Sequence, residues 1–233
     1  MLTDNTQHRQ EDKVYDNVIV GIYLSFLGGF LDAYSYLLKG GVFANAQTGN
    51  LIFLFISLAN QNFHKCIKYI IPIIMFALGI LISELLKQNK GLTNYHRVIA
   101  ALLFEAEVIA VIGFTGTYFQ HDVINCIISF TAAVQVAIFD KVDGNPMATT
   151  MITGNLKNSM INLSKYIYTS DRKYFTSVVT YFFIIVSFGV GVVIGFVTIK
   201  LYHEKSILIC EIFIILSFFI LRKERRAALK TQV

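Results

Sequence analysis

Hydrophobic positions in this chain gather in long runs that short polar segments separate. Six such runs lie at 18–38, 67–86, 98–116, 123–139, 177–202 and 207–221. A helix needs about 20 mostly apolar residues to cross the hydrocarbon core of a bilayer. The pattern therefore predicts an all-α polytopic membrane protein with six transmembrane helices.

Two shorter apolar segments, 48–59 and 153–164, interrupt this series. Both begin with the same four residues, because Thr-Gly-Asn-Leu starts at Thr48 and again at Thr153. A helix of this length reaches roughly 18 Å at 1.5 Å per residue, about half of the roughly 30 Å core. Each segment is therefore either a short spanning helix, which gives eight crossings, or a re-entrant half-helix, which gives six.

The placement of lysine and arginine favours six crossings, because cytoplasmic loops are enriched in both residues. With the N-terminus inside, 15 of the 20 basic residues lie on the cytoplasmic side, against five outside (Lys39, Lys65, Lys68, Lys200 and Lys205). Eight crossings would move the basic loop at 87–97 outside. The sequence thus predicts a multi-pass membrane protein with both termini cytoplasmic.

An internal repeat accompanies the shared Thr-Gly-Asn-Leu. The segment "FALGILIS" at 76–83 matches "FGVGVVIG" at 188–195, and the last run of each half carries an acid, Glu105 or Glu107 in one and Glu211 in the other. These anchors divide the chain into a tail at 1–16, repeat 1 at 17–118, repeat 2 at 119–221 and a basic tail at 222–233. Because each repeat of about 100 residues crosses three times, the two halves must be inverted relative to each other.

Composition agrees with a membrane protein and offers no sign of catalysis. Hydrophobic residues make up 55% of the chain and charged residues 15%, and the net charge is +5. Cys66, Cys126 and Cys210 show no paired spacing, and the histidines form no ligand-like pair. No catalytic residue, metal site or cofactor is expected, and the positive charge is attributed to cytoplasmic loops rather than to nucleic-acid binding.

Inverted repeats would bring the starts of the two half-helices together near the bilayer midplane. A helix N-terminus leaves N–H groups unpaired and carries partial positive charge, which favours a small polar or anionic solute. The alternative is that Thr48 and Thr153 only cap their helices. The candidate substrate-binding residues are Asp32, Asn45, Gln47, Thr48, Gly49, Asn50, Gln135, Thr150, Thr153, Gly154, Asn155 and Asn158.

Polar residues elsewhere in the runs add two expectations. Asn155, Asn158, Ser159 and Asn162 form one polar face, which either lines water or solute or lies flat in the headgroup region. Asp32 and Glu105 leave proton coupling open, because acids inside membrane segments usually serve a function. The competing interpretation of Glu105, Glu107 and Glu211 is a structural ion pair or a hydrogen-bond anchor.

The stretches "GGFLDAYSYLLKGGVFANAQTGNLIFL", "AAVQVAIF" and "TTMITGNL" resemble the YoaK-like family of bacterial multi-pass membrane proteins, a family without assigned function. The chain departs from the family at "VQVAIF", which keeps Gln135 but not a polar neighbour. The resemblance implies an integral, transporter-like protein of the bacterial plasma (inner) membrane. We expect a small-solute transporter or channel in the lipid bilayer, and the sequence leaves a homo-oligomer open. A non-transporting scaffold or sensor that binds through the basic tail is the alternative, and an intramembrane enzyme ranks third.

Overall fold

The computed structural model describes residues 16–88, 91, 93–146 and 151–230, which form an almost entirely helical chain. The elements in chain order are α2 (Val18–Leu38), α3 (Gln47–Ala59), α4 (Phe63–Lys87), α5 (Asn94–Thr115), α6 (His121–Ile138), β1 (Lys141–Val142), β2 (Asn145–Pro146), α7 (Ile152–Thr169), α8 (Arg172–Tyr202), the 3-10 helix η1 (His203–Leu208) and α9 (Ile209–Lys230). The two strands pair antiparallel in a short hairpin that follows α6.

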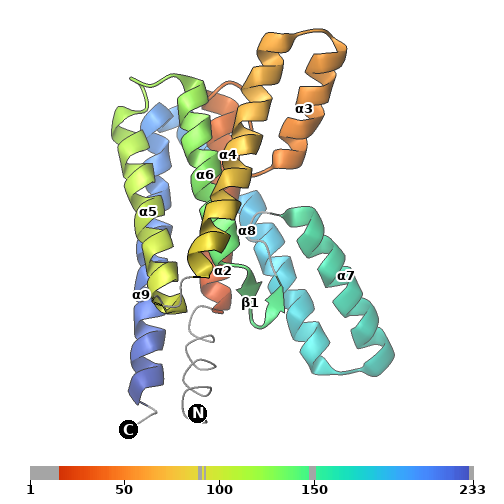
Figure 1. Cartoon of the computed structure of the whole chain (residues 1–233). Coiled ribbons are helices and arrows are strands. Elements are labelled where there is room, and N and C mark those ends of the chain that lie inside the picture. Colours follow the sequence, from red (N-terminus) through yellow and green to blue (C-terminus); the bar gives the residue numbers. More distant parts are fainter. Residues whose placement is uncertain (1–15, 89–90, 92, 147–150, 231–233) are drawn as a thin grey trace.

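The long helices alternate in direction. In Figure 1, α2, α5 and α8 run from the lower end of the molecule to the upper end, and α4, α6 and α9 run back. The shorter helix α3 starts near mid-height and runs upward, whereas α7 starts near mid-height and runs downward. The chain thus begins α2 and ends α9 at the same end of the molecule.

Polar side chains fix the starts of three long helices. Asn17 at the start of α2 accepts the N–H of Ile19 at 2.8 Å, and Asp171 at the start of α8 accepts the N–H of Lys173 at 2.9 Å. Thr93 caps α5 in the same way. Such caps satisfy N–H groups that have no partner within the helix, so each apolar run begins at a defined residue.

Glycines allow α2 and α8 to pack at very short separation. A Cβ atom at Gly191 would lie 2.1 Å from the carbonyl oxygen of Phe26, and one at Gly29 would lie 2.0 Å from that of Phe188. No side chain fits at either position without moving the backbone. Small residues that let two membrane helices approach are a common packing device.

A similar contact joins α4 to α6. A Cβ atom at Gly79 would lie 2.7 Å from both the carbonyl oxygen of Phe130 and the Cβ of Ala133. Further packing joins α5 to α6 and α9, α9 to α2, α3 to α4, and α7 to α8. The first long helix of each half of the chain therefore packs mainly against a helix of the other half.

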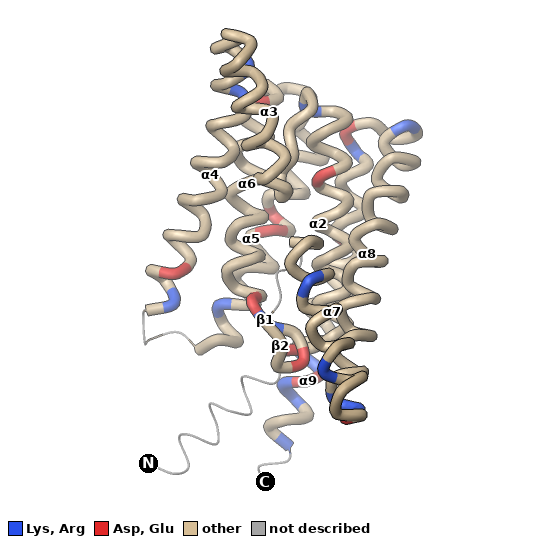
Figure 2. Tube along the Cα trace, turned by 90° about the vertical axis from the view of Figure 1, so that its right-hand side faces the viewer, with Lys and Arg blue, Asp and Glu red and all other residues tan. Residues whose placement is uncertain are grey.

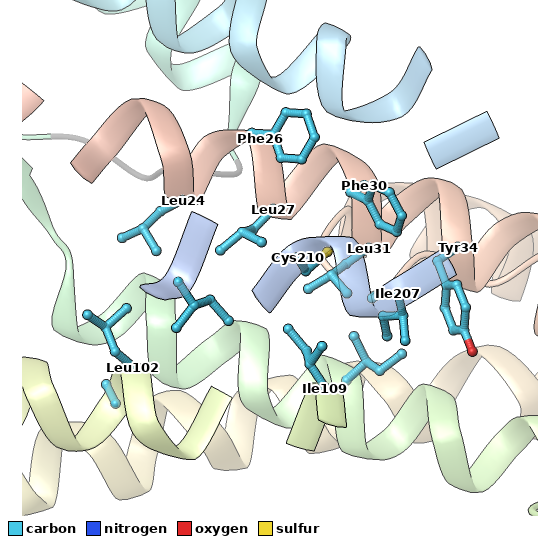
Figure 3. Packing of buried hydrophobic residues seen from close by; sticks show 14 of the residues in the cluster. Leu24, Phe26, Leu27, Phe30, Leu31, Tyr34, Leu102, Ile109, Ile207 and Cys210 are labelled. Carbon is cyan, nitrogen blue, oxygen red and sulfur yellow. The ribbon is translucent and has the colours of Figure 1, made fainter. Parts of the chain in front are cut away.

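The buried core lies between α2, α5 and α9. Figure 3 shows Leu27 and Leu31 from α2 beside Ile109 from α5 and Cys210 from α9. These four side chains belong to one cluster and are at most 2% exposed. Leu102 of α5 extends the cluster toward the lower part of α2.

The outward faces of the helices are apolar, in contrast to those of a water-soluble bundle. On α8, Val193 is 62% exposed and Phe182 58%, whereas the buried face of this helix holds small residues such as Gly191 and Gly195. Exposed apolar faces around small buried ones are expected where lipid is the solvent. Figure 2 shows that most lysines and arginines lie toward the two ends of the molecule.

Within the described residues, five helical segments are long and apolar enough to cross a membrane. The last of them, Arg172–Lys230, contains both α8 and α9, which the 3-10 turn η1 separates. His203 adopts a φ of 48° at this break. These features make the chain a helical, multi-pass membrane-type protein.

Two helices extend further than the sequence predicted. The second short helix was expected at 153–164, but α7 covers Ile152–Thr169 and is roughly 27 Å long. It contains no glycine or proline after Gly154 and ends where Ser170 takes a left-handed conformation. The basic tail expected at 222–233 instead continues α9 to Lys230, because Ala, Leu, Arg, Lys and Glu are strong helix formers.

Candidate functional site

The loop between α2 and α3 folds back onto α2 and hydrogen-bonds to it. Asp32 accepts the backbone N–H of Asn45 at 2.7 Å and that of Ala46 at 3.4 Å, both through Oδ1. Ser35 accepts the N–H of Ala44 at 3.0 Å. A buried loop needs such partners because water does not reach its backbone. Asp32 therefore holds the chain in place just ahead of α3.

Asn50 holds the same loop from the other side. Its Oδ1 accepts the N–H of Phe43 at 2.9 Å, and its Nδ2 donates to the carbonyl of Phe43 at 2.7 Å and to Gln47 Oε1 at 2.8 Å. Gly49 leaves room for the Phe43 ring, since a Cβ atom there would lie 2.7 Å from that ring. Asn50, Gln47 and Gly49 thus shape the loop itself.

The two threonines of the shared motif do not cap their helices. Ala46 precedes α3 and Met151 precedes α7, and neither start has a side-chain cap. The alternative interpretation of a threonine cap was therefore wrong, because the cap position lies two residues before each threonine. The side chains of Thr48 and Thr153 are exposed.

Helices α3 and α7 each pack mainly on the helix that follows them in the chain. Gly154 is exposed and Asn155 is buried. Thr150, another candidate, lies outside the described residues.

Asn45 and Gln135 both donate hydrogen bonds to backbone carbonyls of α2. Asn45 Nδ2 donates to the carbonyl of Gly28 at 3.1 Å, and Gln135 Nε2 donates to that of Leu24 at 3.2 Å. These two carbonyls lie one helical turn apart. The structure therefore brings together three predicted site residues, Asp32, Asn45 and Gln135, that come from α2, the loop and α6.

Four buried side-chain oxygens of the α2–α3 loop and α6 have no hydrogen-bond partner in the described part of the chain. They are Asn45 Oδ1, Asn125 Oδ1, Ser129 Oγ and Gln135 Oε1, and their residues are at most 6% exposed. We call these four residues together with Asp32 the polar seam. Asn125 Nδ2 donates to the carbonyl of Lys39 at 2.8 Å, so the seam follows α2 from Leu24 to Lys39. This distance is roughly 22 Å at 1.5 Å per residue.

Sequence reasoning missed Asn125 and Ser129 in the seam. Both lie on α6, one turn apart, and their side chains are fully buried. Polar side chains inside a transmembrane helix normally face a partner or a water-filled space. Their spacing of four residues, which places both on one face of α6, was the signal that could have found them. Buried polar atoms without partners are costly, which is why we regard the seam as a candidate site.

The polar face of α7 leads to an open cleft. Asn155 and Ser159 are buried, whereas Asn158 and Asn162 are half-buried, and α7 packs along α8. A cleft of about 920 Å³ lies where α7, α8 and the hairpin meet. Its lining is largely polar and comprises Asp16, Asp143, Gly144, Asn145, Asn162, Lys165, Lys173, Tyr174, Thr176 and Ser177. Burial raises the pKa of Asp16, and the Gly144 N–H bonded to its Oδ2 at 2.6 Å opposes that rise.

A buried ion pair lies at the opposite end of the molecule. The Lys39 ammonium is fully buried and lies 2.6 Å from Glu204 Oε1 and 3.2 Å from the carbonyl of Gly116. Tyr34 donates to the other oxygen of Glu204. This cluster, which sequence reasoning did not find, ties the end of α2 to η1 and to the turn after α5.

Glu105, Glu107 and Glu211 are the acids that the sequence placed inside the apolar runs. Glu105 is 2% exposed, Glu211 is half-buried, and Oε1 of each has no hydrogen-bond partner. Glu107 is exposed on another face of α5. Within the described residues, no ion pair includes any of the three. The expected structural ion pair is thus not found there.

Comparison with known proteins gives one match. A family described as "Protein of unknown function (DUF1275)" matches residues 20–220, a range that covers the whole polar seam. No curated protein and no solved structure matches the chain. In the described ranges no group of three or more His, Cys, Asp or Glu side chains could hold a metal ion. The match covers most of the sequence and is compatible with the YoaK-like resemblance, so the chain belongs to the DUF1275 family.

Proposed function

We propose that this protein is a small-solute transporter or channel of the bacterial plasma membrane and that the polar seam is part of its solute path. The observation that carries the proposal is the row of four buried, unpartnered oxygens between α2 and α6. A membrane protein that only needed to fold would lose stability by leaving these atoms unsatisfied. Water or a solute that enters the seam would satisfy them.

The helix packing supports two inverted repeats and six crossings. Packing of α2 on α8 corresponds to packing of α6 on α4, and packing of α5 on α6 corresponds to packing of α9 on α2. Gly191 and Gly79, which match in the sequence repeat, make close approaches in the first pair of contacts. The opposite directions of α3 and α7 agree with this symmetry (Figure 1). Inverted repeats of this kind are common in transporters.

The two ends of the seam differ, which favours a carrier that alternates between two open states. The Lys39–Glu204 pair closes the end near η1. The cleft of about 920 Å³ opens at the other end, beside the hairpin. With both termini in the cytoplasm, as the basic residues predict, this cleft faces the cytoplasm. The exposed hydroxyls of Thr48 and Thr153 remain available to a solute at the starts of α3 and α7.

Cysteine accessibility tests the path without knowledge of the solute. In a background without Cys66, Cys126 and Cys210, Ser129→Cys should react with a small hydrophilic thiol reagent in proteoliposomes. Ser25→Cys is the matched control, because Ser25 is equally buried but donates to the carbonyl of Ile184 at 2.9 Å. Reaction at 129 and protection at 25 support a wet path. Protection of both, in folded protein, overturns it.

Reporter fusions test the six crossings. A reporter after residue 233 and one inserted at His121 should report opposite sides of the membrane, because α9 ends and α6 begins at opposite ends of the molecule (Figure 1). A result with both reporters on one side would contradict this topology. The fusions also test whether the cleft beside the hairpin faces the cytoplasm.

A surface on α9 favours the second candidate, a scaffold or sensor. Phe219 and the basic residues Arg222, Lys223, Arg226 and Lys230 line an open groove near the end of this helix. Basic side chains next to an apolar one suit anionic lipid headgroups. The scaffold or sensor function is supported if the thiol test finds a dry seam and if anionic lipid binds to the groove on α9.

A further inference from the structure

The chemistry of the seam indicates which solutes it can take. Asn45 and Gln135 both direct their amide nitrogens at backbone carbonyls of α2, which fixes the orientation of the two amides. Their oxygens therefore point away from α2 and lack donors. Asn125 is oriented in the same way, since its Nδ2 donates to the carbonyl of Lys39. Apart from the Ser129 hydroxyl, every unpartnered atom of the seam is a hydrogen-bond acceptor.

The charge of the seam also favours a solute that donates hydrogen bonds and is not an anion. Asp32 is the one titratable residue of the seam, and no basic side chain in the described part of the chain forms an ion pair with it. The nearest basic group along α2, Lys39, is bound to Glu204. The N–H groups of Asn45 and Ala46, just before α3, already bind Asp32. The start of this helix thus faces a carboxylate, which disfavours an anion there.

We propose that the seam binds small ammonium-type cations, R–NH3+, with the amide oxygens of Asn45 and Gln135 as acceptors for the N–H groups. This inference rests on the proposed transport function and changes the solute class that the sequence predicted. An ammonium group offers three donors and a positive charge. Amide oxygens and one carboxylate fit such a group, whereas a bare anion would meet only acceptors.

The test compares three probes with purified protein in liposomes. Methylammonium, formate and glycerol represent a cation, an anion and a neutral solute, and each flux is measured against protein-free liposomes. We expect methylammonium to cross fastest. Formate or glycerol flux that exceeds methylammonium flux overturns the cation inference but leaves transport standing. Flux at the protein-free rate for all three probes, together with a dry seam in the thiol test, overturns both.

Substitutions at Gln135 assign the effect to the seam. Gln135→Leu replaces the amide with an apolar side chain of similar size and so removes the acceptor oxygen. This change should lower methylammonium flux roughly 5- to 150-fold, the range expected for one buried hydrogen bond. Gln135→Glu adds negative charge and should tighten methylammonium binding. The matched control, Gln120→Leu, lies at the exposed start of the same helix and should leave the flux unchanged.

The test at Gln135 still works if one of the two variants folds poorly. Thermal unfolding identifies the poorly folded variant, and the other variant is then compared with the parent. Equal methylammonium flux in Gln135→Leu, Gln120→Leu and the parent overturns the assignment. Weaker methylammonium binding in a folded Gln135→Glu variant also overturns it, because added negative charge must favour a cation at this site.

Discussion

Replacement of Asp32 separates the two roles that this residue could have, a loop anchor and a solute ligand. In the structure its Oδ1 accepts two backbone N–H groups, at 2.7 Å from Asn45 and 3.4 Å from Ala46. Asp32→Ala leaves both donors without a partner. A buried donor that loses its partner costs about 1–3 kcal/mol. Because Ala46 is only half-buried, we expect a total loss of about 2–4 kcal/mol in the free energy of unfolding.

Asp32→Asn should cost much less, because the amide keeps an acceptor oxygen for the loop. The difference between a charged and a neutral hydrogen bond is about 1 kcal/mol. Glu107→Ala serves as the control, since Glu107 is exposed and should lose less than about 0.5 kcal/mol. Unfolding is followed by circular dichroism of purified protein in detergent, and an Ala46→Cys probe reports loosening of the loop.

The opposite result would refute the anchor role. If Asp32→Ala is as stable as Glu107→Ala and Ala46→Cys reacts no faster in that background, the loop does not depend on the carboxylate. Loss of methylammonium flux without loss of stability would then make Asp32 a solute ligand. Loss of stability in Asp32→Ala, with stability largely kept in Asp32→Asn, is the result that the structure predicts.

Two further predictions concern packing and buried charge. Gly191→Ala should destabilise the protein by about 1–3 kcal/mol or more, because the added Cβ would lie 2.1 Å from a carbonyl oxygen of α2. Gly189→Ala should be neutral, because a Cβ at residue 189 would have no neighbouring atom within 4 Å. Comparable unfolding temperatures for the two variants would contradict the packing. Glu105→Gln should stabilise the protein by up to roughly 3 kcal/mol at alkaline pH, since it removes a buried carboxyl without a basic partner, while Glu107→Gln should change little. The gain at residue 105 should shrink as the pH falls and the carboxyl takes up a proton.

The helical architecture was predictable from the sequence because apolar runs of membrane length have few alternatives. The run at 18–38 coincides with α2, and Asn17 explains its first residue. The extents of α7 and α9 were not predictable in the same way. Their later residues are polar or basic but still favour helix. The apolar run in the sequence therefore ends before the helix does, and hydropathy alone places the helix end too early.

The candidate site was predictable only in part. Asp32, Asn45 and Gln135 stood out as polar residues in apolar surroundings, and the structure places all three along α2. Their partners are backbone groups, however, and a sequence does not show which backbone groups a polar side chain will meet. The sequence likewise did not show where α3 begins. Thr48 is the first residue of the predicted short helix, but the N-cap residue in the structure is Ala46.

The ion pair between Lys39 and Glu204 was beyond sequence reasoning, because its members are separated by 165 residues. Its Lys39 side chain is fully buried, which distinguishes it from an ordinary surface pair. Removal of one partner leaves a buried charge alone and should cost about 3–5 kcal/mol, so Lys39→Met and Glu204→Gln should each lower the unfolding temperature markedly. The exposed pair of Lys87 and Glu84 provides the control.

The double variant, Lys39→Met with Glu204→Gln, decides what the pair is for. It leaves no unpaired charge, so its stability should recover most of the loss of either single variant. If the pair also closes the seam at this end, the double variant should make Asn125→Cys reactive toward reagent added on the side of η1, where the parent protects it. Recovered stability with unchanged protection would show that the pair only joins α2 to η1. Faster reaction in a stable double variant would identify it as the gate, since the reagent reaches residue 125 only after that end has opened.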